Sequence, residues 1–287
     1  MAKPIVAIMY DFDKTLCTQD MQNYAFIPNL GMTPAEFWGE TTKVCDKYNM
    51  DKILGYMYMM VKACREKNIP LTKEYLKSLG AKVELFKGVD TWFERINDYA
   101  DSLGLKVEHY IVSSGTKEII EGCKIAHEFK KIYGCEFLYD ENKNAIWPKM
   151  AINYTNKTQY LFRISKGALD VNDEITLNQV IPDSERRVQY NNMIYIGDGM
   201  TDIPCMKLVK SRNGKSIAIY QTSEKEKILP LVNDGRINYA CPGDYRENSK
   251  LERIVKLILE NMATSHKIVK TEEKILNEYL NSVEKEQ

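Results

Sequence analysis

The sequence lacks the features that mark several classes of protein. It contains three histidines without the spacing of metal ligands, and none of its seven cysteines forms a C-x-x-C pair, so no pattern for a zinc site is present. An odd number of cysteines argues against a disulfide framework and favours free thiols in a reducing compartment. No run approaches the roughly 20 apolar residues of a membrane span, and the first residues lack the apolar stretch and cleavage site of a signal peptide. We therefore expect a cytoplasmic protein without a membrane partner.

An excess of charge of one sign is also absent. Lys and Arg together number 40, as do Asp and Glu, so the formal net charge is zero. Binding to the phosphate backbone of nucleic acid usually needs a basic patch, so we expect no nucleic-acid partner. Hydrophobic residues (44%) and charged residues (28%) occur in the proportions of a globular protein, and 287 residues suffice for one large domain or two unequal ones.

Apolar runs of strand length recur along the chain, with helical patterns between them. The expected strands are residues 4–10, 107–112, 193–196 and 216–220, and the expected helices that follow three of them are 117–133, 202–209 and 224–232. Near-continuous apolar strands separated by helices are typical of a parallel sheet that is covered on both faces. The predicted fold class is therefore α/β, with a doubly wound, mostly parallel, Rossmann-like sheet.

One long segment interrupts this alternation. Between residues 21 and 84 helical patterns occur at 34–48, 52–67 and 72–79, and no convincing strand is present. Helical spacing on the second of these predicts a buried face formed by Leu54, Met57, Tyr58, Val61 and Cys64. We interpret residues 18–86 as a helical domain inserted into a core domain of residues 1–17 and 87–287.

Two further elements are expected toward the C-terminus. Residues 135–139 and 145–149 flank a polar turn and predict a β-hairpin. A helix is expected at 250–262, and a helical stripe beyond it consists of Ile275, Leu276, Tyr279, Leu280 and Val283. We expect this stripe to dock on the core of the same chain; docking on another subunit is the alternative.

Two carboxylates follow the first expected strand. Asp11 and Asp13 are two residues apart, and alternate residues of a strand share a face, so both acids can converge at its carboxyl end. Ligands bind at that edge of open α/β sheets. Like charges this close resist joint ionisation, so either a metal ion neutralises them or one stays protonated. A nucleophile beside a general acid needs such divided behaviour. A single acid at this position would be explained as a cap of the next helix or turn. The pair of acids instead favours a catalytic or metal-binding role.

A second acidic turn follows the strand at 193–196. It has the sequence Gly197-Asp198-Gly199-Met200-Thr201-Asp202, in which the glycines allow a tight turn and close approach to a ligand. Asp202 stands where an acid also caps a helix, and the two roles remain equally open from sequence alone. Several carboxylates at one sheet edge would form an oxygen-rich site suited to Mg²⁺.

A third stretch, Ser113-Ser114-Gly115-Thr116, follows the strand at 107–112. Hydroxyls and amides at the start of a helix form an anion cradle, although Ser and Thr are also common helix caps.

Taken in order, D-F-D-K-T-L, V-S-S-G and G-D-G-M-T-D resemble motifs I, II and IV of the haloacid dehalogenase superfamily of phosphohydrolases. The insertion between the first two resembles the helical C1 cap of the phosphoserine phosphatase-like branch. The resemblance covers roughly residues 4–245 and is specific at the three motifs.

The resemblance implies a mechanism and a set of roles. Asp11 would attack phosphorus and form an aspartyl-phosphate, and Asp13 would protonate the leaving oxygen and then activate water. Mg²⁺ would be held by the Asp11 carboxylate, the Asp13 backbone carbonyl and Asp198. Further roles implied are support by Thr15, Gly199 and Asp202 and phosphoryl binding by Ser113, Ser114 and a lysine. The expected activity is a Mg²⁺-dependent phosphatase acting on a small phosphorylated metabolite.

Three residues are candidates for that lysine: Lys149, Lys157 and Lys166. Residues 153–158 predict a helix start, and helix starts in a doubly wound fold tend toward the ligand edge. Lys166 would lie about nine residues, or ~13 Å, farther along. We therefore predict Lys157, with Lys149 open because the hairpin could bring it near.

Indications of the substrate are few. Asp20 lies nine residues after Asp11, where phosphoserine phosphatases carry a glutamate that contacts the substrate amine, and Arg65 could bind a carboxylate from the cap. Lys14 departs from the serine or glycine usual after the second aspartate. The alternatives are a phosphotransferase of the same superfamily and a non-catalytic member that binds a phosphorylated ligand. A P-type ATPase is excluded by the lack of membrane spans, and Asp13 argues against a dehalogenase. The sequence does not indicate the oligomeric state.

Overall fold

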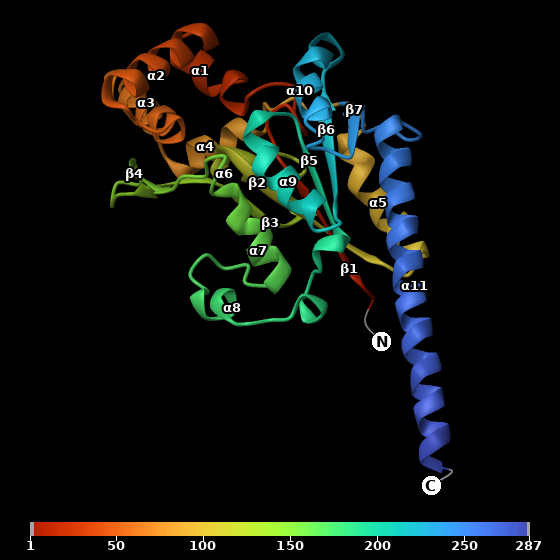
Figure 1. Cartoon of the computed structure of the whole chain (residues 1–287). Helices are drawn as coiled ribbons and strands as arrows, with labels where there is room; N and C mark the ends of the chain where they lie inside the picture. The colour runs from red at the N-terminus through yellow and green to blue at the C-terminus, as the bar shows by residue number, and fades with distance from the viewer. Residues whose placement is uncertain (1–2, 286–287) are drawn as a thin grey trace.

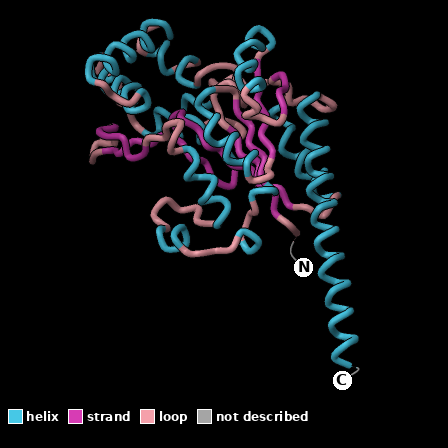
Figure 2. The backbone as a smooth tube through the Cα atoms, viewed as in Figure 1, coloured by secondary structure: helices cyan, strands magenta, loops and turns pink. Residues whose placement is uncertain are grey.

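The computed structural model describes residues 3–285 and contains a seven-stranded sheet in the order β4-β3-β2-β1-β5-β6-β7 (Figures 1 and 2). The strands are β1 Ile5–Tyr10, β2 Lys106–Thr116, β3 Phe129–Tyr139, β4 Ala145–Met150, β5 Met193–Gly197, β6 Lys215–Tyr220 and β7 Tyr239–Pro242. All neighbouring pairs are parallel except β3 and β4, which form an antiparallel hairpin. The predicted α/β class, the four predicted strands and the hairpin are confirmed.

The central strand shows why the sheet forms. In β1 every residue from Val6 to Tyr10 is buried, because the strand is paired on both edges and covered on both faces. Its register places Tyr10 opposite Ile111 of β2 and Ile196 of β5. The carboxyl ends of these three strands therefore lie side by side.

The helix predicted at residues 117–133 is wrong over most of its length. Helix α6 covers only Lys117–Glu121, and β3 begins at Phe129. Phe129 and Tyr133 are spaced as on a helical face, but β3 pairs in parallel with β2 and buries the alternate residues Tyr133, Cys135 and Phe137. Pairing with the sheet prevails over the local pattern because it satisfies the backbone and buries these side chains together.

The helices cover both faces of the sheet. Besides α6 they are α1 Phe26–Asn29, α2 Pro34–Tyr48, α3 Lys52–Glu66, α4 Lys73–Gly80, α5 Val89–Ser102, α7 Lys157–Lys166, α8 Glu174–Asn178, α9 Ile203–Ser211, α10 Leu229–Asn233 and α11 Lys250–Lys285. The crossover through α5 runs from β1 toward β2, and the crossover through α9 runs the opposite way, from β5 to β6. Right-handed crossovers in opposite directions place these helices on opposite faces. Helix α11 packs on α5, and α7 packs on α9.

Four helices, α1 to α4, form the insertion between β1 and β2, at the upper left of Figure 1. Their ends follow from the sequence: Thr33 and Glu36 form a reciprocal capping box ahead of α2 with Pro34 at its first position, and Asp51 caps α3. On α3, Met57 and Cys64 are buried as predicted, but Leu54 (39%) and Tyr58 (47%) are exposed. The predicted buried face is therefore only partly covered.

The prediction that the C-terminal stripe docks on the core is wrong. Helix α11 packs on the core through its first part, where Val255, Leu259 and Met262 are buried, and then extends away from the other elements (Figure 1). Between 58% and 66% of each stripe residue with a described side chain is exposed: Ile275, Leu276, Tyr279 and Leu280. Val283 lies outside the residues whose side chains are described. The helix is longer than the sheet that it covers, so its end has no core to contact.

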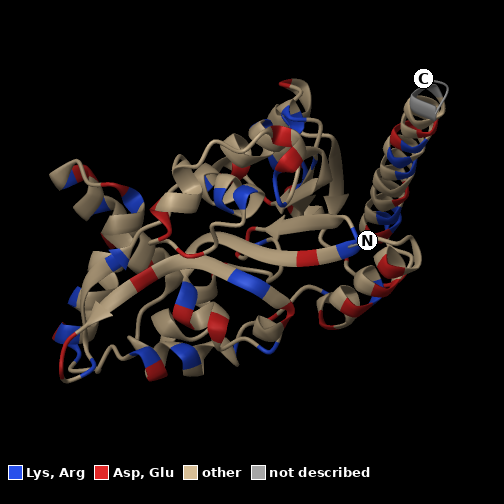
Figure 3. Ribbon diagram, turned by 90° about the horizontal axis from the view of Figure 1, so that it is seen from below, with Lys and Arg blue, Asp and Glu red and all other residues tan. Residues whose placement is uncertain are grey.

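Basic and acidic residues are interspersed along the ribbon in Figure 3, consistent with the zero net charge. Within residues 3–285 no helix combines the length and the apolar character needed to cross a bilayer.

Candidate active site

Three acids meet where β1 and β5 end. The backbone amide of Asp11 donates to the Ile196 carbonyl at 2.9 Å, which fixes the end of β1 against the end of β5. One carboxylate oxygen from each of Asp11, Asp198 and Asp202 lies within 4.8 Å of the others. The structure therefore brings Asp11, which follows β1, and the acidic turn at residues 197–202, which follows β5, to one point.

A buried lysine lies between two of these acids. The Lys157 ammonium, at the start of α7, is 3.0 Å from Asp11 Oδ1 and 2.8 Å from Asp202 Oδ1. Burial raises the pKa of Asp11 to about 6, and Lys157 offsets part of that effect. Lys157 itself is completely buried, yet the two carboxylates keep its pKa raised, so it stays charged. A fixed positive charge beside Asp11 suits the binding of a phosphoryl group.

The turn after β5 holds Asp202 in place. Asp202 is fully buried and accepts hydrogen bonds from the Tyr195 hydroxyl at 2.7 Å and from the Gly199 amide at 3.4 Å. A Cβ at Gly197 would collide with the Asp202 carboxylate, so the turn needs glycine there. Burial, followed by the charges of Asp202 and Asp11, raises the pKa of Asp198 well above its ordinary value. Three neighbouring carboxylates carry more negative charge than one lysine balances, which favours the binding of a cation at this point.

Asp13 is oriented by the chain that leads into the insertion. Its Oδ1 accepts the Met21 amide at 2.7 Å, and a Cβ at Gly115 would lie 2.9 Å from its Oδ2. Burial, and then the charges of Asp20 and Asp11, raises the pKa of Asp13 well above its ordinary value. This environment favours a protonated carboxyl that can donate a proton. Thr15 is buried nearby and its Oγ1 has no partner among the described residues.

The serines after the β2 apolar run line the same site. Ser113 is buried, and its Oγ accepts the Gly115 amide at 3.0 Å, which leaves the hydroxyl proton free to donate to an anion. The Ser114 Oγ is buried without a partner among the described residues. The Ser114 carbonyl accepts the Tyr56 hydroxyl of α3 at 2.7 Å, which ties the insertion to this loop.

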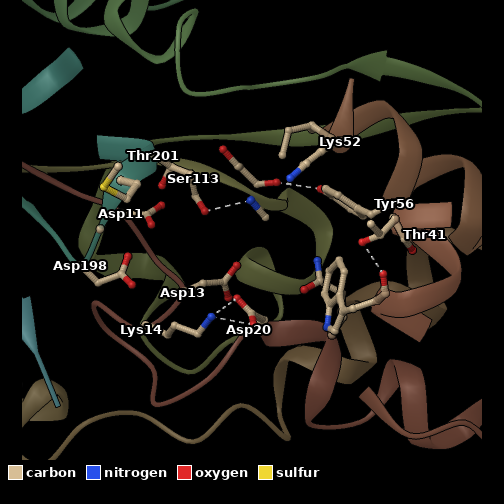
Figure 4. Close-up of a pocket in the computed structure, with 18 of the residues that line it drawn as sticks. Asp11, Asp13, Lys14, Asp20, Thr41, Lys52, Tyr56, Ser113, Asp198 and Thr201 are labelled. Atoms are coloured by element: carbon tan, nitrogen blue, oxygen red, sulfur yellow. Dashed lines mark hydrogen bonds and ion pairs between the residues drawn. The ribbon is translucent and has the colours of Figure 1, made fainter. Parts of the chain in front are cut away.

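These residues line a cavity of about 360 Å³ between the sheet edge and the insertion. In Figure 4, Asp11, Asp13, Ser113 and Asp198 lie on one side, and Lys52, Tyr56 and Thr41 lie across from them. Lys52 and Trp38 also line the cavity but follow no motif, so the sequence did not single them out. The only sequence indication for Lys52 is its position at the first turn of α3.

Other predicted residues have different surroundings. The Asp20 carboxylate lines the cavity but is paired through both oxygens with the Lys14 ammonium, at 2.9 and 2.8 Å. Arg65 lines a separate apolar cavity of about 480 Å³ between α3 and β4. Lys149 lies on β4 and pairs with Glu136 at 3.1 Å, whereas Lys157 reaches the acids.

The fold and the site define a protein of the α/β class with a helical insertion over an acidic sheet edge. The chain belongs to the haloacid dehalogenase-like hydrolases, whose family model matches residues 8–207. An uncharacterized protein of Borreliella burgdorferi is 28% identical over 276 residues, covering 86% of this chain and 94% of the relative.

Solved structures share the fold at low identity. A phosphoserine phosphatase with a phospho-aspartyl intermediate analogue has a TM-score of 0.55 and 14% identity, covering 89% of this chain and 99% of the other. A probable phosphoserine phosphatase from Vibrio cholerae has a TM-score of 0.57 and 13% identity, covering 92% and 67%. At this identity the likeness concerns the fold alone.

Proposed function

We propose that the chain is a Mg²⁺-dependent phosphatase that hydrolyses a small phosphomonoester through an aspartyl-phosphate on Asp11. The observation that carries the proposal is the convergence of Asp11, Asp198 and Asp202, with the Lys157 ammonium in contact with Asp11 and Asp202. A solved relative of the fold contains a phospho-aspartyl intermediate analogue, and another is a substrate-bound phosphoserine phosphatase, which supports this chemistry. We also propose residues 18–86 as the cap domain.

The residues present fit a magnesium ion. Mg²⁺ prefers oxygen ligands, and the acids supply a compact set with more negative charge than Lys157 balances. The carboxylates of Asp11 and Asp198 and the backbone carbonyl of Asp13 would hold it, with Asp202 in support. When bound, the ion would neutralise charge that develops on the phosphoryl oxygens.

The chain's own residues perform the proton and phosphoryl transfers. An oxygen of Asp11 attacks phosphorus, the bond to the leaving oxygen breaks, and the Asp13 carboxyl gives its proton to that oxygen. Asp13, now a carboxylate, takes a proton from water, and the resulting hydroxide attacks phosphorus to release phosphate and restore Asp11. Lys157 and the Ser113 hydroxyl bind the phosphoryl oxygens and orient them, which supplies most of the rate enhancement in such transfers.

The test is Asp11→Asn with para-nitrophenyl phosphate and Mg²⁺. We expect the variant to lose turnover by at least ~10³-fold, because an amide does not attack phosphorus. Its circular-dichroism spectrum should match that of the wild type. Asp46→Asn, on the exposed surface of α2, is the matched control and should retain activity. Retained turnover in Asp11→Asn would refute the assigned nucleophile.

Transfer to an acceptor other than water is the alternative within the same site. Adding glycerol or ethanol during turnover separates the two, because a phosphotransferase forms the phosphorylated alcohol, whereas a phosphatase releases inorganic phosphate. Absence of any metal-dependent turnover over a panel of phosphomonoesters would favour a non-catalytic member that binds a phosphorylated ligand.

A further inference from the structure

Among the described residues, the hydroxyl, indole and ammonium groups that helices α2 and α3 place on the cavity are already engaged in hydrogen bonds, with one exception. Trp38 Nε1 donates to Asn23 at 3.0 Å, the Thr41 and Thr42 hydroxyls donate to carbonyls of their own helix at 2.9 Å, and the Tyr56 hydroxyl donates to Ser114 at 2.7 Å. These groups therefore offer a substrate mainly their apolar surfaces.

Lys52 is the exception. Its side chain lines the cavity on the side opposite Asp11 and Asp198 (Figure 4). Within residues 3–285 no carboxylate lies within ion-pair distance of its ammonium. The neighbouring acid, Asp51, is used elsewhere: its Oδ1 accepts the amides of Ile53 and Leu54, and its Oδ2 accepts Asn153 at 3.2 Å. Among the described residues, Lys52 thus adds to this end of the cavity a positive charge that is not held in an ion pair.

Besides the acids that follow β1 and β5, Asp20 is the only carboxylate among the described residues that lines the cavity. Its charge is neutralised by Lys14. Both oxygens of Asp20 accept the Lys14 ammonium. Lys14 follows Asp13 directly and has a left-handed backbone with φ 55°, a turn that directs its side chain back to Asp20. An ammonium group of a substrate would have to displace Lys14 and would also face Lys52. The cavity therefore disfavours a leaving group that carries an ammonium group.

We propose that the cavity selects phosphomonoesters whose short leaving group carries a second negative charge, a carboxylate or a second phosphate, and no ammonium. Lys52 binds that charge, while the Lys14–Asp20 pair excludes an amine. This inference rests on the proposed phosphatase function and specifies its substrate class. It separates the chain from enzymes that act on phosphorylated amino acids or amino alcohols.

The experiment compares three esters that differ in leaving-group charge: 2-phosphoglycolate, glycerol 1-phosphate and phosphoethanolamine. We expect the wild type to show the highest kcat/KM for 2-phosphoglycolate and the lowest for phosphoethanolamine. In Lys52→Met the ratio of kcat/KM for 2-phosphoglycolate to that for glycerol 1-phosphate should fall by roughly 10- to 100-fold, the loss of one charge-assisted contact. Lys43→Met, an exposed lysine of α2 that does not line the cavity, should leave the ratio unchanged.

Two further variants test the opposite change in substrate preference, toward the ester that carries an ammonium group. Lys52→Glu and Lys14→Ala should both raise kcat/KM for phosphoethanolamine relative to 2-phosphoglycolate, the first by adding a carboxylate and the second by freeing Asp20. Turnover of para-nitrophenyl phosphate without a preference among the three esters, or a preference that Lys52→Met does not change, would overturn this inference and leave the phosphatase proposal standing. No metal-dependent turnover of any ester would overturn both.

Discussion

Lys157 is fully buried, and the contacts of its ammonium with Asp11 at 3.0 Å and Asp202 at 2.8 Å balance part of the negative charge of the site. Lys157→Met should lower the free energy of unfolding by about 3–5 kcal/mol in the presence of chelator, because it leaves buried carboxylates without their counter-charge. Urea unfolding followed by circular dichroism measures this.

Lys149→Met is the matched control, because Lys149 is exposed and pairs only with Glu136 among the described residues. It should change the free energy of unfolding by less than about 1 kcal/mol. Equal effects of the two substitutions would contradict the assignment of Lys157 as the lysine of the site.

Glu108 of β2 gives a pH-dependent test away from the site. Burial opposes its ionisation, but hydrogen bonds from Arg187, Lys130 and Tyr110 outweigh this and lower its pKa from 4.5 to about 2. A carboxyl whose pKa is lower in the folded state than in the unfolded state contributes its full stabilisation at a pH above its unfolded-state pKa. This contribution should therefore be lost as the pH falls from about 4.5 toward 2.

Glu108→Gln should lower the free energy of unfolding by roughly 1–3 kcal/mol at pH 7. The difference from the wild type should shrink as the pH is lowered from 4.5 to 3, measured by urea unfolding at each pH. A difference that stays constant with pH would show that the Glu108 charge does not stabilise the fold.

Among the elements, the contact of α4 with α6 joins the insertion to the core. It depends on two glycines: a Cβ at Gly80 would collide with the Ile119 carbonyl, and one at Gly122 would collide with the Lys77 carbonyl. Gly80→Ala should therefore lower the free energy of unfolding by about 1–3 kcal/mol through overpacking.

Gly39, in the middle of α2, has open space where a Cβ would stand, with no neighbouring atom within 4 Å of that position. Gly39→Ala should therefore be neutral or stabilising by about 0.5–1 kcal/mol. The two substitutions are chemically identical, and thermal unfolding of both separates close packing from backbone entropy. A stabilising Gly80→Ala would contradict the close contact of α4 with α6.

The elements that the sequence predicted well are those whose environment is uniform. Strand β1 is apolar throughout because it is central, so its pattern identified both the strand and the edge that carries Asp11. Residues 129–133 were mispredicted because their apolar spacing fits a helix and a strand alike, and only the pairing with β2 decides between them. The face of α3 with Leu54 and Tyr58 was predicted as buried because periodicity does not reveal how far β4 covers it.

The same limit applies to the site. The acids were predictable because strand alternation and parallel topology bring strand ends together whatever the rest of the chain does. The position of Lys52 on the cavity was not predictable, because its proposed role depends on where the insertion lies over the sheet edge and on the pairing of Lys14 with Asp20.

For the whole molecule, bound magnesium should raise stability. A ligand at 100 times its Kd stabilises a folded protein by about 2.7 kcal/mol. For a chain of this size that corresponds to a rise in Tm of roughly 5–10 °C. We expect such a rise when MgCl₂ replaces EDTA, measured by differential scanning fluorimetry, with NaCl at matched ionic strength as the control for screening.

Asp198→Asn should affect Tm differently in EDTA and in MgCl₂. In EDTA the substitution removes one of three crowded charges within 4.8 Å, so the variant should be at least as stable as the wild type. In MgCl₂ it lacks a ligand, so most of the rise in Tm should disappear. Repulsion alone would give only the first effect, and a structural role for Asp198 would lower Tm under both conditions. A variant that keeps the full rise in Tm with Mg²⁺ would therefore exclude Asp198 as a ligand, and with it the metal site proposed at the ends of β1 and β5.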